Sequence, residues 1–213
     1  MSGAGEAVHE YAKLASAACC SALILLAGCA SFQVGGYVQQ GRNALHAREP
    51  ATAVSYLRKA ADLDPNYRAP GSFYGSVLTY LGRAYYETEN LTEARTVLEQ
   101  ALANDKDDYM ARFYLGLLRL RSGDQASGRR EVESGLKSIY ATLESLSTSP
   151  YQGIFWDPGR KIRSEIQTAL SAKLAPAEFV TEAERIGSQV DEEIEKVRRD
   201  ELEDQRSKGG DGM

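Results

Sequence analysis

The residues with most capacity for nucleophilic or metal-binding chemistry, cysteine and histidine, are few in this 213-residue chain. They are Cys19, Cys20, Cys29, His9 and His46. Cys29 directly follows Leu26-Ala27-Gly28, at the end of an apolar run that begins at Ala15. The run is shorter than the ~20 residues of a membrane-spanning helix and ends in small residues, a pattern typical of a cleaved signal segment. The sequence therefore predicts that this N-terminal segment is cleaved off.

The stretch Leu26-Ala27-Gly28-Cys29 resembles the lipobox of bacterial lipoproteins. The resemblance implies that residues 1–28 are a signal peptide, that Cys29 carries a diacylglycerol and acyl chains such as palmitate, and that residues 29–33 are a lipidated tether in the cell envelope. Ala30 and Ser31 follow the cysteine, with no Asp to mark inner-membrane retention in the enterobacterial rule, which favours the periplasmic face of the outer membrane. An ordinary cleaved signal and an uncleaved anchor are the alternative interpretations.

Processing at Cys29 would leave one histidine, His46, and no free thiol. One histidine supplies neither a recognisable Ser-His-Asp set nor a histidine-rich metal site. We therefore expect a protein that is not an enzyme and needs no metal and no cofactor. The formal net charge is −5 and no basic block stands out, so nucleic acid is not an expected partner.

Three glycines mark an internal repeat. Gly82 and Gly116 are 34 residues apart, and Gly41 precedes Gly82 by the same period plus an insert of 7. The small and bulky residues that follow at helical spacing are Ala53, Leu57, Ala60 and Pro65, then Ala94, Leu98 and Ala101, then Gly128, Val132 and Gly135. This pattern resembles the tetratricopeptide repeat, a helix–turn–helix unit of about 34 residues.

The resemblance implies an all-α fold, a short solenoid of about three repeats over residues 34–147. The expected helices cover residues 33–47, 50–63, 72–88, 91–104, 107–122 and 125–147, with residues 66–72 as the insert. In each repeat, the glycine of the first helix is expected to let the second helix approach closely. The bulky Leu57, Leu98 and Val132 are expected to fill the gap between one repeat and the next.

In this family the first helices line a concave groove, which implies a protein or peptide partner. The groove positions carried over by register are Arg42, His46, Arg83, Tyr86, Phe113, Leu117 and Arg121. Arg42 and Arg83 could bind a carboxylate or phosphate bidentately, or lie in solvent. Phe113 and Leu117 begin an apolar strip that either binds a ligand or packs under the chain's own C-terminal helices, because a terminal repeat cannot bury its open face alone.

Residues 148–206 are expected to form capping and amphipathic helices. The segment Ile154-Phe155-Trp156 is interpreted as a plug for the open end of the solenoid. The next helix, from Arg160 to about Leu174, begins with basic residues that oppose the helix dipole, so they contact anionic lipid or a partner, or face water. After Pro176, apolar residues at spacings of three and four predict an amphipathic helix that packs on the repeats or pairs with another chain as an oligomer. Residues 207–213 are expected to be a disordered tail.

These features favour a membrane-anchored scaffold or adaptor that recruits a protein partner to a cell-envelope assembly. The alternative is a periplasmic small-ligand-binding accessory lipoprotein of a tripartite ATP-independent periplasmic transporter. That alternative requires an open apolar pocket beside Phe113 and Leu117.

Overall fold

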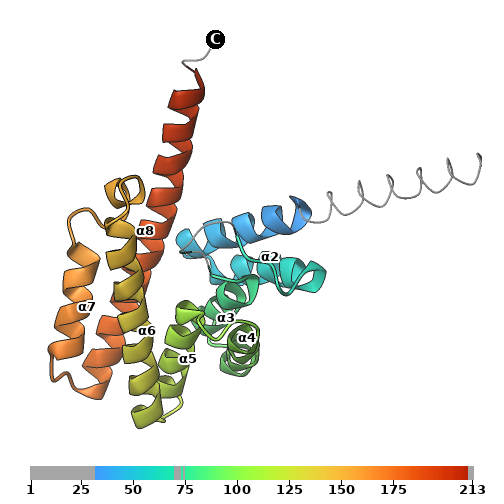
Figure 1. The fold of residues 1–213 in the computed structure, drawn as a ribbon. Helices are drawn as coiled ribbons and strands as arrows, with labels where there is room; N and C mark the ends of the chain where they lie inside the picture. The colour runs from blue at the N-terminus through green and yellow to red at the C-terminus, as the bar shows by residue number, and fades with distance from the viewer. Residues whose placement is uncertain (1–31, 70–72, 74, 211–213) are drawn as a thin grey trace, which may run out of the picture.

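The computed structural model describes residues 32–69, 73 and 75–210; the predicted signal peptide and Cys29 lie outside these residues. Within them, the regular structure is helical apart from one isolated antiparallel bridge between Arg68 and Ser76. A helical segment over residues 32–46 comes first. The helices that follow are α2 (Pro50–Leu63), α3 (Val77–Glu87), α4 (Leu91–Asn104), α5 (Tyr109–Arg121), α6 (Gln125–Ser147), α7 (Lys161–Ser171) and α8 (Pro176–Gly210), with a 3-10 turn η1 at Gln152–Ile154. The predicted all-α solenoid is confirmed (Figure 1).

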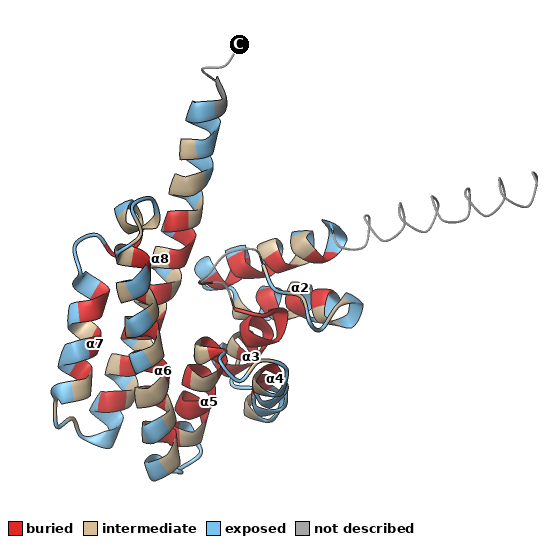
Figure 2. Cartoon of the chain, in the orientation of Figure 1, coloured by how far each residue is buried: buried red, intermediate tan, exposed pale blue. Residues whose placement is uncertain are grey.

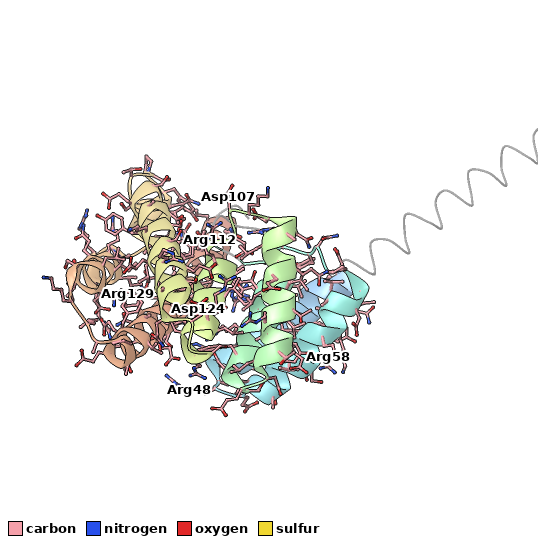
Figure 3. All side chains as sticks on the ribbon, turned by 90° about the horizontal axis from the view of Figure 1, so that it is seen from below. Arg48, Arg58, Asp107, Arg112, Asp124 and Arg129 are labelled. Carbon is pink, nitrogen blue, oxygen red and sulfur yellow. The ribbon has the colours of Figure 1, made fainter. Side chains whose placement is uncertain are left out.

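The helices pack as successive pairs. Helix α3 packs on both α2 and α4, and α5 packs on α4 and, most extensively, on α6. Helices α7 and α8 complete the C-terminal side, where α8 contacts both α5 and α7 (Figure 1). Seen from below, Arg58 of α2 and Arg129 of α6 lie on opposite sides of the molecule (Figure 3). The solenoid therefore runs from α2 on one side of the molecule to α6 on the other.

The glycines of the repeat pattern lie where the paired helices approach most closely. A Cβ placed on Gly41 would lie 2.5 Å from Leu57 Cγ, and one on Gly82 would lie 2.5 Å from Leu98 Cγ. A Cβ on Gly116 would lie 2.6 Å from the backbone nitrogen of Val132. The predicted close approach is confirmed, but each bulky residue packs against the glycine of its own repeat, rather than only filling the gap to the next one.

Local chemistry explains where the repeat helices begin. Pro50 opens α2, where its fixed φ suits the first turn. The side chains of Ser76, Asp108 and Asp124 accept hydrogen bonds from the backbone N–H groups of Thr79, Ala111 and Ser127, and so cap α3, α5 and α6. The helix expected from residue 72 begins only at Val77, because Ser76 pairs with Arg68 in extended conformation and then caps the helix.

The buried residues form one core that runs through the repeats into the C-terminal helices (Figure 2). Its C-terminal part includes Phe179, Ile186, Val190 and Val197 on one face of α8. The predicted amphipathic helix is therefore present and packs on its own chain. It continues through Gly210, so the tail expected to be disordered from residue 207 is helical for its first four positions.

The predicted aromatic plug is only partly correct. Trp156 is buried and packs against Phe73, with ring centroids 4.8 Å apart. Ile154, in contrast, lies on the surface with 66% of its area exposed. The end of the solenoid is also covered by α7, which packs on α6, and by α8, which packs on α5.

Candidate functional site: an arginine row closed by helix α8

The concave side of the repeats faces α8 across a polar cavity of about 380 Å³. The repeat wall comes from the 32–46 segment, α3 and α5, and it includes Arg42, Arg83 and Arg121. We call these residues the arginine row. The opposite wall is one face of α8, which includes Glu184, Ser188, Asp191 and Glu195. The predicted groove therefore exists, and the chain's own C-terminal helix lies over it.

Each member of the arginine row pairs with a different carboxylate of α8. Arg42 Nη2 lies 2.5 Å from Glu195 Oε1, Arg83 Nη1 lies 2.6 Å from Asp191 Oδ2, and Arg121 Nη2 lies 2.8 Å from Glu184 Oε1. The order is antiparallel: the first repeat meets the most C-terminal acid. The bidentate binding of one ligand by Arg42 and Arg83, which the sequence suggested, is replaced by two separate ion pairs.

Burial of these ion pairs decreases along the row. The Arg42 and Glu195 side chains are 4% and 9% exposed, whereas those of Arg121 and Glu184 are 35% and 34% exposed. Removing one partner of a buried pair is costly because the other charge is left without compensation, whereas an exposed pair contributes little. The Arg42 end of the row is therefore the firmly closed end.

Tyrosines hold the guanidinium groups in place. Arg42 lies over the ring of Tyr80 at 5.3 Å, and Arg83 lies over that of Tyr114 at 5.9 Å. Arg121 lies over the ring of Tyr86 at 4.3 Å. Each distance is within the range in which a cation is attracted to the face of an aromatic ring. Each arginine of the row is therefore held between a carboxylate and an aromatic face.

Two of these tyrosines also bond to α8. The Tyr114 hydroxyl donates to Asp191 Oδ2 at 3.1 Å, and the Tyr86 hydroxyl donates to Glu184. Burial is the main cause that raises the pKa of both tyrosines well above the ordinary value, so both hydroxyls stay protonated and act as donors. These bonds add a neutral contact beside two of the three ion pairs.

We call the contact between the arginine row and the three acids Glu184, Asp191 and Glu195 of α8 the seam. Within the seam, Asp191 is the carboxyl group whose pKa is clearly shifted. Burial raises the pKa of its carboxyl group from 3.8 to about 6, although Arg83 and the Tyr114 hydroxyl act in the opposite direction. Glu87 and Glu195 raise this pKa further because their negative charges lie nearby. The seam thus contains a carboxyl group that titrates in mildly acidic conditions.

The apolar groove residues are closed off as well. Phe113 and Leu117 are fully buried. The Phe113 ring packs so closely on α8 that a Cβ on Gly187 would lie 2.8 Å from its Cε1. Of the two roles expected for this strip, it therefore has the second, packing under a C-terminal helix. His46 remains exposed at the edge of the cavity.

The basic first turn of α7 has an internal explanation. The Arg163 side chain is 2% exposed, and its Nε donates to Asp157 Oδ2 at 2.9 Å. The same guanidinium also contacts Glu144 and Ser147, while the Asp157 carboxylate accepts from the backbone N–H groups of Ile162 and Arg163. Arg160 pairs with Glu144 at 3.3 Å. For Arg163 the structure thus contradicts both expected roles, contact with a lipid or partner and exposure to water.

The sequence patterns do not predict the acidic residues of the site, which lie on α8. Glu184, Asp191 and Glu195 stand out there only as part of a densely charged helix face, and Tyr80 and Tyr114 are not assigned to the groove. A signal was available: positions 184, 188, 191 and 195 share one side of a helix. What the sequence does not encode locally is which charged face of that helix meets the groove.

The fold and the groove define an all-α helical-repeat protein, a class whose concave surfaces bind other polypeptides. Within the chain, residues 81–142 match the family model described as tetratricopeptide repeat. This stretch spans most of α3, all of α4 and α5, and most of α6, and it supports the resemblance drawn from the glycine pattern. No curated protein and no solved structure matches the chain.

Among residues 32–69, 73 and 75–210, no helix combines the length and hydropathy needed to cross a membrane. In the same part of the chain, no group of three or more His, Cys, Asp or Glu residues is arranged to hold a metal ion.

Proposed function

We propose that this protein is a membrane-anchored tetratricopeptide adaptor that recruits a protein partner to a cell-envelope assembly. The observation that carries the proposal is the tetratricopeptide match over residues 81–142, in a solenoid whose concave side displays the arginine row. Tetratricopeptide arrays are a non-catalytic repeat fold that generally mediates protein–protein interaction. The polar, charged lining of the groove suits a polypeptide ligand better than an apolar small molecule.

The membrane part of the proposal rests on the lipobox-like Leu26-Ala27-Gly28-Cys29. A lipid on Cys29 would hold the solenoid at a membrane face through the short segment that precedes the 32–46 helix. Globomycin, which blocks the lipoprotein signal peptidase, should cause the uncleaved precursor to accumulate. A Cys29→Ser variant should lose the lipid and leave the membrane fraction. Unchanged processing and fractionation would contradict the anchor.

The recruitment part is tested by affinity capture from detergent-solubilised envelope. The wild type is compared with Arg121→Glu, which reverses the most exposed charge of the arginine row, and with Arg95→Glu as a matched control, an exposed arginine of α4 that does not line the cavity. We expect a specific partner with the wild type and with Arg95→Glu, and at least a tenfold lower recovery with Arg121→Glu. Equal recovery from all three proteins would show that the partner binds elsewhere.

The small-ligand alternative required an open apolar pocket beside Phe113 and Leu117. In the structure, both side chains are fully buried and Phe113 packs against Gly187 of α8, while the cavity that Leu117 borders is lined largely by charged and tyrosine side chains. The adaptor is therefore the function that the geometry of the groove favours.

A further inference from the structure

Helix α8 presents two different faces to the rest of the molecule. Its apolar face, with Phe179, Ile186 and Val190, is buried in the core. Its acidic face carries Glu184, Asp191 and Glu195, which point to the arginine row. The first face packs α8 into the core of its own chain, whereas the second resembles a bound ligand in the concave groove.

The contacts on the acidic face follow a simple pattern. Counting Glu184 as position 1, carboxylates lie at positions 1, 8 and 12, and the small residue Gly187 lies at position 4. The three carboxylates match one arginine from each repeat, while Gly187 lets the helix backbone approach the Phe113 ring. Because each position has its own counterpart on the repeat wall, the arginine row can recognise a helix by its spacing as well as by its charge.

The acidic face is also the face of α8 that borders the cavity. The cavity of about 380 Å³ lies beside it and is lined by both walls, so polar side chains rather than a closed apolar seam join the two. A competing carboxylate that replaced Glu184 or Asp191 would leave no arginine of the row without a partner. The cost of an unpaired buried charge, which otherwise holds such a seam closed, would then be avoided for the arginines, while the displaced carboxylates of α8 move into solvent.

We propose that the partner segment of this adaptor is an acidic helix with the same spacing, and that α8 occupies the arginine row as an internal ligand with which the partner competes. This inference rests on the proposed function and specifies the chemistry of its partner. The partner helix would begin to displace α8 at Arg121, where the ion pair is most exposed, and displacement would proceed toward Arg42.

The test uses the full chain and a fluorescein-labelled synthetic peptide of residues 182–197, the α8 segment itself. Three proteins are compared by fluorescence anisotropy. The first is the wild type, and the second carries Glu184→Gln, Asp191→Asn and Glu195→Gln. The third carries Glu201→Gln, Glu203→Gln and Asp204→Asn, the same charge change on the distal part of α8 outside the seam.

We expect the seam variant to bind the peptide at least tenfold more tightly than the wild type and the distal variant. A peptide with Lys in place of its three seam acids should not bind, and adding Arg121→Ala to the seam variant should reduce the affinity. Equal affinity in the seam and distal variants, or binding that is unchanged by Arg121→Ala, would overturn the proposal.

Folding is checked by far-UV circular dichroism. The single variant Glu184→Gln removes only the most exposed carboxylate and keeps the proposal testable if the triple variant is unfolded. It should bind more tightly than the wild type, and folded Glu184→Gln that does not would also overturn the proposal. Such a failure is distinct from failure of the adaptor function, because affinity capture would still recover a partner that uses another surface.

Discussion

Arg42 and Glu195 form a buried ion pair although they are 153 residues apart in the chain. The pair joins the first repeat to the C-terminal helix α8. Two more ion pairs continue the same seam toward the third repeat. The concave surface of the repeats is thus occupied by the chain's own C-terminal helix.

Loss of Glu195 should be strongly destabilising. In Glu195→Gln, the buried Arg42 guanidinium would lose its ion pair with Glu195, and breaking such a pair typically costs about 3–5 kcal/mol. Urea unfolding followed by circular dichroism measures this difference. Lys208→Ala, which removes an exposed pair with Asp204, is the control and should change stability far less. A similar small effect for Glu195→Gln would contradict the buried pair.

Asp191 should make stability depend on pH. Because its pKa in the folded protein is raised from 3.8 to about 6, the folded state binds this proton more tightly than the unfolded state. Its contribution is therefore fully present below pH ~4 and is lost as pH rises through about 6. The free energy of unfolding of the wild type, relative to Asp191→Asn, should fall by about 2 kcal/mol between pH 4 and pH 7.

The control for this pH dependence is Asp204→Asn. Hydrogen bonds from Lys208 and Tyr151 lower the pKa of Asp204, so its contribution should follow the reverse trend. A wild-type advantage over Asp191→Asn that grew with rising pH would mean that the attraction of Arg83 outweighs burial, and that the Asp191 assignment is wrong.

Gly116 should not tolerate even a methyl group. A Cβ there would meet the backbone of α6 at 2.6 Å, and overpacking of this kind costs about 1–3 kcal/mol. Gly36 is the matched control, because it is also helical but a Cβ placed on it would have no neighbouring atom within 4 Å. Gly36→Ala should raise stability by up to ~1 kcal/mol through helix propensity alone. Thermal or urea unfolding of both variants compares them, and equal effects would argue against close α5–α6 packing.

Asp157 should be essential for the position of α7. Its carboxylate caps the first turn and pairs with the buried Arg163, so Asp157→Ala removes both interactions. We expect a loss of at least about 3 kcal/mol in unfolding free energy. The double variant Asp157→Ala/Arg163→Met, which leaves no buried charge unpaired, should recover part of that loss. No recovery would mean that the cap, rather than the ion pair, dominates.

The sequence predicts the repeat helices well because their signals are local. The limits of α2, α4 and α6 agree with the structure to the residue, since Pro50 opens α2 and the glycine period sets the spacing of the pairs. Helix α3 begins later than expected because Ser76 first pairs with Arg68, and this contact is not visible in a helical pattern.

Only the arginine row of the candidate site could be predicted from the sequence. The register of the repeats gives Arg42, Arg83 and Arg121, because those positions follow from the family pattern. Their partners belong to a helix more than 60 residues further along, and the angle at which it packs depends on the whole core. For the same reason, the buried partner of Trp156, Phe73, could not be deduced from the aromatic segment itself.

The closed groove is tested most directly by a set of double-mutant cycles on the full chain, with unfolding free energy as the readout. We expect a stabilising coupling of about 0.5–3 kcal/mol between Arg42 and Glu195, and a smaller one of about 0.2–1 kcal/mol between Arg121 and Glu184. The crossed pair, Arg42 with Glu184, should be additive within about 0.5 kcal/mol. Couplings that are absent, or equal for matched and crossed pairs, would contradict the seating of α8 on the arginine row.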